Sequence, residues 1–300
     1  MKGPIAALFF LTATALMGQS VLGVGNFIHV VANLDRSIEF YHGALGLEMR
    51  GSPGPYSFSA NAIVSSLYDA PGAQSRVTSF KIPGSDMAVE IVEFQGVKSK
   101  PVRPRFFDPG AITLTLLVQD LEATKNRLHQ LKGLEWISAR QDAVVVSDPD
   151  GIFVELVQPR KDPSGSVAAS DANPVRLGVT VEDAGKTARL YQEALGFTGG
   201  VSAGGAKLRV PGDAFPVQFA ALNYADRKPG HSEIHDPGSG VLRLRVADFD
   251  AALTALKAAG ATVVSASGEP VNLGRNRAVI LRDMNNLFVQ LLESAPPAAK

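Results

Sequence analysis

Two glutamates occupy the same place in two similar apolar segments, and their chemistry depends on where they point. Glu90 lies in the middle of residues 87–92, and Glu155 lies in the middle of residues 152–157. If both side chains face one cavity, their carboxylates could hold one divalent metal ion, such as Fe²⁺, Mn²⁺, Zn²⁺, Ni²⁺ or Mg²⁺. Without a metal, two buried carboxylates repel each other, which raises the pKa of at least one and suits acid–base catalysis. Alternatively, each glutamate faces solvent on a one-sided sheet.

Both segments end copies of a unit that occurs four times in the chain. The copies start at positions 26, 113, 176 and 241 with an apolar, β-branched run, followed by a segment whose apolar residues recur at helical spacing. In the first copy, Asp35 is expected to cap the helix and Gly46 to end it. Shorter extended segments complete each copy. The unit is therefore predicted to be βαβββ, and the fold class to be α+β.

Two motifs in these copies carry a resemblance to a known family. They are residues 35–47, with the sequence DRSIEFYHGALGL, and residues 148–156, with the sequence DPDGIFVEL. This pattern resembles the vicinal oxygen chelate superfamily, which includes glyoxalase I, extradiol dioxygenases, and bleomycin and fosfomycin resistance proteins. The resemblance implies four βαβββ modules paired into two half-barrel, glyoxalase-like domains. It also implies a small-molecule site inside each half-barrel, where active members hold a divalent metal.

The domain boundaries follow from composition. Pro, Ser, Gly, Ala and Asp cluster in residues 158–173, as in a flexible linker. Residues 51–74 are an insertion in the first copy, with the composition of a loop and the length of a lid or pocket wall. The expected division is a signal peptide (1–23), a first domain with modules 1 and 2 (24–160), a linker (161–172), a second domain with modules 3 and 4 (173–294) and a tail (295–300).

The resemblance also assigns positions to a metal site. Superfamily ligands come from the start of each module's first strand, usually His, and from the middle of its last strand, usually Glu. In the first pair these positions are Asn26, Glu90, Thr113 and Glu155, so both carboxylates are present and both histidines are missing. His29 could replace one histidine as a ligand. It follows Asn26 by three positions, however, and faces the opposite side of a regular strand unless a β-bulge turns it inward.

The corresponding positions of the second pair are poorer in ligands. Arg176, Gln218, Val241 and Gln290 offer no anion, and a cation beside Arg176 would be repelled. Arg176 instead suits binding of a carboxylate or phosphate, with a surface charge as the alternative. Phe107 precedes the second module and either lines the first cup or covers a core edge. The residues expected to contact a substrate are Asn26, Thr113, Phe107 and Arg176.

Composition excludes several functions. The chain has no cysteine, which removes disulfide scaffolds, thiolate zinc sites, iron–sulfur clusters and cysteine nucleophiles. Its 29 Lys and Arg balance 29 Asp and Glu, and it has no basic stripe, so nucleic acid is not an expected partner. No Gly-x-Ser-x-Gly elbow, Walker loop or Gly-x-Gly-x-x-Gly motif anchors a serine hydrolase, nucleotidase or nicotinamide enzyme.

The first residues have the character of a secretory signal peptide. Lys2 is followed by the apolar residues 5–17, and the sequence Ala13-Thr14-Ala15 offers a cleavage site, with 18–23 as alternatives. The apolar run falls short of the roughly 20 residues that span a bilayer. We therefore expect a periplasmic or secreted protein whose mature form does not enter a membrane.

Two functions of different classes fit these residues, and the sequence leaves open whether the protein is an enzyme. The first is a glyoxalase-like or dioxygenase-like enzyme, a lyase or dioxygenase acting on a small oxygenated substrate in the first domain. There Glu90 and Glu155 would hold a metal or move protons. The second is a metal-free protein that sequesters a small molecule, as bleomycin resistance proteins do. A structural or partner-binding role is expected only if the cups are filled by their own side chains. The partner is a small molecule in both main cases, and a homo-oligomer is compatible with either.

Overall fold

The computed structural model describes residues 21–51, 54, 56–159, 175–213, 215–221, 226, 228 and 230–295. Most of the predicted signal peptide, the whole predicted linker and most of the predicted tail lie outside the described residues. None of the described helices combines the length and apolar character needed to cross a membrane.

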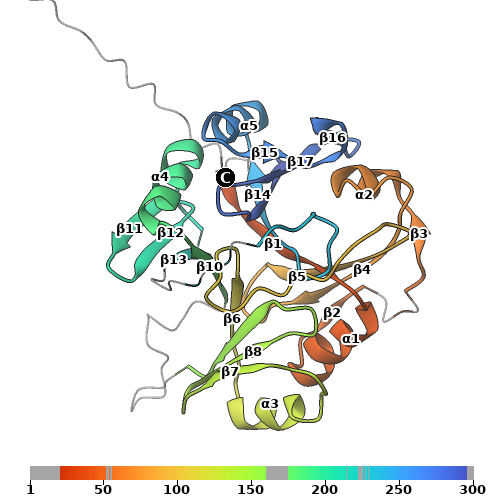
Figure 1. Ribbon diagram of the computed structural model, residues 1–300, viewed down its shortest axis with the longest axis vertical. Helices are drawn as coiled ribbons and strands as arrows, with labels where there is room; N and C mark the ends of the chain where they lie inside the picture. The colour runs from red at the N-terminus through yellow and green to blue at the C-terminus, as the bar shows by residue number, and fades with distance from the viewer. Residues whose placement is uncertain are drawn as a thin grey trace, which may run out of the picture.

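One mixed sheet is built from the first and the last module. Its strands are β1 (Val21–Val31), β2 (Met49–Arg50), β3 (Ser59–Ala60), β4 (Gln74–Lys81), β5 (Ala88–Gln95), β14 (Gly240–Val246), β15 (Thr262–Val263), β16 (Val271–Asn272), β17 (Arg277–Arg282) and β18 (Phe288–Glu293). The strand order is β15-β17-β18-β14-β1-β5-β4-β2, with β16 paired to β17 and β3 paired to β4 (Figure 1). The strands nearest the two ends of the described chain therefore belong to the same sheet.

The second and third modules form the other sheet. Its strands are β6 (Ile112–Leu117), β7 (Trp136–Ala139), β8 (Ala143–Ser147), β9 (Phe153–Val157), β10 (Val175–Val181), β11 (Thr198–Ser202), β12 (Gly205–Arg209) and β13 (Pro216–Ala221). Their order is β11-β12-β13-β10-β6-β9-β8-β7. Each sheet thus contains two modules, and the prediction of four βαβββ modules paired into two half-barrels is confirmed.

The partners in each pair differ from the prediction. We expected module 1 to pair with module 2, and module 3 with module 4. Instead, β1 runs antiparallel to β14, with Ile28 opposite Val241, and β6 runs antiparallel to β10, with Thr113 opposite Gly178. The physical reason is that every module leaves its first strand at the edge of its own strands. All four first strands are similar apolar runs, so the local sequence does not show which two will pair.

The helices follow the first strand of each module, as the periodicity predicts. They are α1 (Leu34–Ile38), continued by the π-helical turn η1 (Glu39–Ala44), α3 (Leu121–Leu128), α4 (Ala184–Leu195) and α5 (Phe249–Ala258). The cap of α1 is Asn33 rather than the predicted Asp35, because the Asn33 side chain accepts the Arg36 backbone N–H. One apolar core spans all four modules and packs these helices against one face of each sheet.

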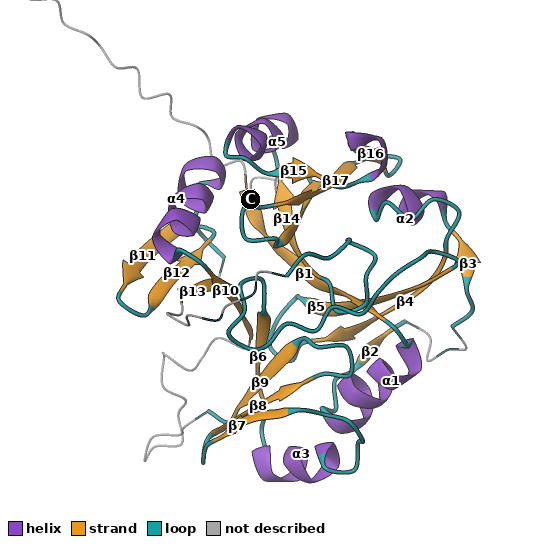
Figure 2. Cartoon of the chain, in the orientation of Figure 1, coloured by secondary structure: helices purple, strands orange, loops and turns teal. Residues whose placement is uncertain are grey.

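The opposite face of each sheet turns away from these four helices. We call this face of the sheet containing β1 and β14 the outer cup, and that of the sheet containing β6 and β10 the inner cup. The insertion in the first module lies over the outer cup and forms α2 (Ala62–Leu67), which contacts β16 and β17 (Figure 2). Leu67 and Tyr68 belong to an apolar cluster there with Ile28, Val92 and Phe288. The insertion therefore forms a wall of the outer cup.

Candidate functional site

Four polar side chains meet in the outer cup, one from each strand at its centre: Asn26 on β1, Glu90 on β5, Arg243 on β14 and Gln290 on β18. Arg243 donates from Nη1 and Nη2 to the two carboxylate oxygens of Glu90, at 3.0 and 3.1 Å. Its Nε donates to Oε1 of Gln290 at 2.7 Å. Asn26 donates from Nδ2 to Glu90 at 3.3 Å, and its Oδ1 accepts the Ala88 N–H. Glu90 is therefore held by a bidentate ion pair and by an amide.

Arg243 was not predicted from the sequence, because the matching position in the repeat was Val241. Arg243 follows Val241 by two positions, so both side chains lie on the same face of β14. Gly25 makes room for it, because a Cβ on Gly25 would lie 2.9 Å from Cδ of Arg243. The available signal was a charged residue inside an apolar strand, but its approach to Glu90 requires that β14 pair with β1, which was not predicted.

A cleft of about 400 Å³ opens beside Glu90. The polar residues that line it beside Glu90 are Arg50, Tyr56, Thr78 and Ser79, of which Ser79 lies opposite Glu90 in the ladder between β4 and β5. The Thr78 hydroxyl donates to the Tyr56 hydroxyl at 3.0 Å, which ties the insertion to β4. The cleft therefore offers several hydrogen-bonding groups around a single ion-paired carboxylate.

Tyr68 brings a second aromatic side chain from the insertion to this cluster. Burial, and then the negative charge of Glu90, raise the pKa of Tyr68 far above its usual value, while Arg243 partly offsets them. The Tyr68 ring packs against Phe94, with centroids 5.3 Å apart. The Tyr68 phenol therefore stays protonated at any physiological pH, and it cannot act as a base.

These residues do not fit a divalent cation. A typical protein site for such an ion needs several anionic or imidazole ligands. At the centre of the outer cup the carboxylate is that of Glu90, and Arg243 already occupies both of its oxygens. In the part of the chain that the structure describes, no three His, Asp or Glu side chains come together as a metal site. A cation beside the Arg243 guanidinium would also be repelled.

The inner cup surrounds Glu155 with different partners. The Thr115 hydroxyl donates to Oε2 of Glu155 at 2.9 Å, and Nη2 of Arg140 donates to Oε1 at 3.2 Å. Nη2 of Arg176 lies 4.0 Å from Oε2. Thr113 was predicted to share a site with Glu155, but Thr115 is the residue opposite it in the ladder. The prediction missed the true partner by two positions on the same face of the strand.

The predicted residues are therefore divided between two sites. Glu90 and Glu155 lie in different sheets, so they cannot hold one metal or share a proton. This corrects the expectation of a joint site, and the cause is the pairing of module 1 with module 4. Asn26 does contact Glu90, and Arg176 lies beside Glu155 rather than in a separate domain. Phe107 packs against Phe106 at the inner cup and does not line the cup that holds Glu90.

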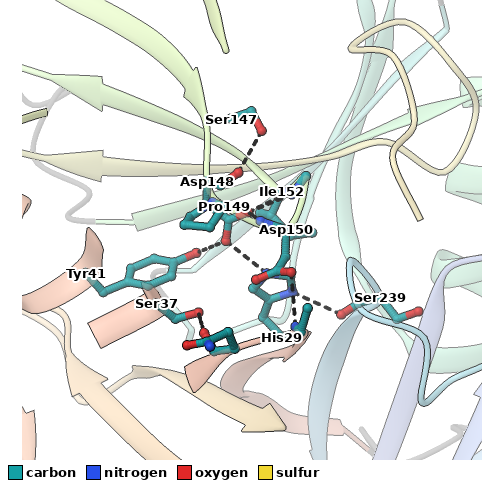
Figure 3. A network of polar contacts seen from close by, with 12 residues as sticks. His29, Ser37, Tyr41, Ser147, Asp148, Pro149, Asp150, Ile152 and Ser239 are labelled. Carbon is teal, nitrogen blue, oxygen red and sulfur yellow. Dashed lines mark hydrogen bonds and ion pairs between the residues drawn. The ribbon is translucent and has the colours of Figure 1, made fainter. Parts of the chain in front are cut away.

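His29 points away from both cups, into the core between the sheets (Figure 3). It is fully buried and lies opposite Ile91 in the ladder with β5. Its Nε2 is 2.9 Å from Oδ2 of Asp148, and its Nδ1 is 3.2 Å from the carbonyl oxygen of Ser239. The odd spacing from Asn26 predicted this facing correctly. The proposed role of His29 as a metal ligand beside Glu90 or Glu155 does not fit this position.

Asp148 lies at the centre of this buried network. Its Oδ1 accepts backbone N–H groups from residues 150–152, and its Oδ2 accepts the Tyr41 hydroxyl at 3.0 Å. Burial alone would raise the pKa of Asp148, but the charge of His29 and these hydrogen bonds lower it overall. Burial alone would lower the pKa of His29, but Asp148 and Asp150 raise it overall. The network is therefore an ion pair that joins modules 1 and 2 to the loop before module 4.

The second half of the chain repeats part of this network without the histidine. The Tyr191 hydroxyl donates to Oδ2 of Asp283 at 3.0 Å, as Tyr41 does to Asp148. The position equivalent to His29 in the third module is Val179, which is buried. The tyrosine–aspartate contact thus occurs in both halves, and the imidazole of His29 is added to it in the first half.

Comparison with known proteins agrees with this architecture. A family profile described as the Glyoxalase/Bleomycin resistance protein/Dioxygenase superfamily matches residues 23–156 and 173–290. The chain belongs to this superfamily. Glyoxalase I from Zea mays superposes with a TM-score of 0.57 at 17% identity, covering 90% of this chain and 92% of that one. A putative dioxygenase from Bacillus subtilis gives a TM-score of 0.56 at 16% identity, covering 93% and 87%. A comparison with curated proteins found no match.

At these identities the structural likeness shows the fold alone. The chemistry has to be argued from the side chains in the two cups. Across the outer cup, Glu90 is the carboxylate that the resemblance implies, whereas Asn26, Val241 and Gln290 stand where it implies two histidines and a second glutamate, and Arg243 pairs with Glu90. This glyoxalase-superfamily protein therefore keeps the scaffold of a metal site but carries a salt bridge at its centre.

Proposed function

We propose that this member of the glyoxalase superfamily is a metal-independent small-molecule binding protein, with its ligand site in the cleft of the outer cup. The observation that carries the proposal is the bidentate contact between Arg243 and Glu90, which occupies both oxygens of the carboxylate at the centre of the cup. Both side chains are four-fifths or more buried. A cation bound to Glu90 would displace Arg243 from the carboxylate. The guanidinium would then be buried beside a like charge.

The lining of the cleft suggests the class of ligand. The Ser79 hydroxyl can donate and accept hydrogen bonds on the face that it shares with Glu90, and Tyr56 and Thr78 also line the cleft, while the Glu90 charge is already neutralised by Arg243. A small, oxygen-rich, uncharged molecule matches such a surface better than an ion does. Arg50 at the cleft adds one donor group for a carbonyl or hydroxyl oxygen.

Metal analysis is the first test. The mature chain would be purified without a metal-binding tag, and its metals measured by elemental mass spectrometry before and after incubation with Fe²⁺, Mn²⁺, Zn²⁺ and Ni²⁺. We expect less than a stoichiometric amount of every metal. One equivalent per chain, lost in Glu90→Gln, would overturn the proposal in favour of a metal-dependent lyase or dioxygenase.

Ligand screening is the second test. Small oxygenated compounds would be screened by thermal shift, and the affinity of each hit measured in matched variants. Ser79→Ala removes a hydroxyl from the face of β4 beside Glu90, whereas Thr115→Val removes one from the inner cup. We expect the first variant to weaken binding about fivefold and the second to leave it unchanged, since one hydrogen bond contributes about 1 kcal/mol. Equal effects of both variants would place the ligand elsewhere.

We propose that the protein acts in the periplasm or after secretion, on the strength of Lys2 and the apolar residues 5–17. A homo-oligomer stays a prediction, which analytical ultracentrifugation of the mature chain tests.

A further inference from the structure

The centre of the inner cup has more positive than negative charge. The ladder places Arg176 opposite Thr115, and Thr115 opposite Glu155, so these three side chains share one face. Arg140 reaches the same carboxylate from the end of β7, at 3.2 Å. Two guanidinium groups therefore share one carboxylate. Arg176, at 4.0 Å from it, is beyond hydrogen-bond distance but close enough to attract it.

Strand β12 adds two more cations to this face. Lys207 lies opposite Gln218, which faces the inner cup, and Arg209 follows two positions later on the same side of the strand. Both side chains are exposed, while the alternating residues Ala206 and Leu208 are buried in the core. The basic residues of β12 and the arginine pair thus lie on one continuous surface.

An apolar patch adjoins the charged group. Phe153 lies on β9 two residues before the glutamate, so its side chain faces the same cup. Phe106 packs edge-on against Phe153 and against Phe107, with centroids 5.1 and 5.2 Å apart. Val145 and Ile137 complete this patch. An exposed fraction of 37% leaves part of Phe107 in contact with solvent.

We propose that the inner cup is a second ligand site, which binds a small organic carboxylate with an aromatic or branched apolar body. Arg140 and Arg176 bind the carboxylate, because planar guanidinium groups donate paired hydrogen bonds to it. The partly exposed rings of Phe106 and Phe107 contact the apolar body, and buried Phe153 supports them from below. Glu155 sets the position of both arginines and competes with the ligand for them. This site lies in a different sheet from the outer cup and does not depend on the function proposed there.

Benzoate is a suitable probe, with benzamide as its uncharged equivalent. Each would be titrated into the full mature chain in low-salt buffer by isothermal titration calorimetry. We expect one equivalent of benzoate to bind, benzamide to bind at least tenfold more weakly, and Arg176→Gln or Arg140→Gln to weaken benzoate at least tenfold. Arg36→Gln, on an exposed face of α1, and Arg50→Gln, in the outer cup, should leave benzoate binding unchanged.

Glu155→Gln separates a binding role from a structural one. Glutamine keeps an acceptor for the Thr115 hydroxyl but removes the competing charge, so benzoate should bind severalfold more tightly. Thermal unfolding of each variant would show that the fold is retained. Absence of benzoate binding, equal binding of benzamide, or weaker binding by Glu155→Gln would overturn the proposal. Tighter binding of inorganic phosphate than of benzoate would also overturn the assignment of an organic carboxylate.

Discussion

The buried ion pair between His29 and Asp148 makes a quantitative prediction about stability. His29→Gln keeps a side chain of similar size that can hydrogen-bond, and removes the positive charge. Asp148 is 1% exposed, but it keeps three backbone N–H donors and the Tyr41 hydroxyl. The expected loss therefore lies at the lower end of the range for breaking a buried ion pair, at about 3 kcal/mol of unfolding free energy.

The two pKa shifts predict at which pH the loss of stability in His29→Gln is largest. The pKa of His29 is raised in the folded protein, so its contribution is complete below the unfolded-state value near 6.5 and declines as pH rises through the folded-state value. The pKa of Asp148 is lowered, so its contribution is complete above the ordinary carboxylate value and is lost only in stronger acid. The difference between wild type and His29→Gln should be largest at about pH 5 to 6.5 and should shrink in alkaline solution.

Urea unfolding followed by circular dichroism at pH 6 and pH 9 measures this difference. An NMR titration of the histidine ring protons measures the pKa itself, with the His29 signal identified by its absence in the variant. His231, whose side chain is 68% exposed, serves as a reference for a solvent-exposed histidine. A titration of His29 at or below pH 6.5, or the same free-energy difference at both pH values, would refute the ion-pair reasoning.

Three further predictions concern the turns, the second half and the N-terminus. Gly238→Ala should lower the unfolding free energy by at least about 2 kcal/mol, because its φ is +99° and a Cβ would lie 2.2 Å from the Val102 carbonyl oxygen; unchanged urea unfolding would contradict this. Tyr191→Phe should destabilise by about 1.5 to 3 kcal/mol in the same assay, because it removes a hydrogen bond to buried Asp283, and a neutral effect would argue against that contact. The mature protein should begin before Val21, since this residue is fully buried at the start of β1; N-terminal sequencing that finds cleavage after residue 23 would contradict the prediction.

Much of the fold could be predicted from the sequence because its determinants are local. Apolar periodicity showed the helix after each first strand, and the shorter extended segments that follow showed the remaining strands of each module. The choice of partner between modules depends on contacts between distant strands, such as Ile28 with Val241. No local pattern distinguishes this pairing from the pairing of module 1 with module 2. The sequence alone therefore did not predict which modules share a sheet.

The candidate sites were predicted less completely, for a related reason. Alternation correctly separated His29 from Asn26, because an odd spacing of three puts two side chains on opposite faces of a strand. Arg243 was missed, because its contact with Glu90 depends on the pairing of β14 with β1, which joins the first module to the last. Glu90 and Glu155 were each placed correctly in a final strand, but their separation followed from the module pairing.

The exchange of partners between modules has a consequence for how the chain assembles. Residues 21–159 contribute one half of each sheet and complete neither, so that half alone would leave β1 and β6 without their central neighbours. Strand β1 can pair with β5 of its own module, but it gains its second neighbour only when β14 has been synthesised, so folding depends on long-range contacts and is expected to be slow. An isolated half should associate with a second copy of itself, with β1 of each copy taking β6 of the other as its neighbour. In the intact chain, each half supplies one module to each of the two sheets, as two copies would in a domain-swapped dimer.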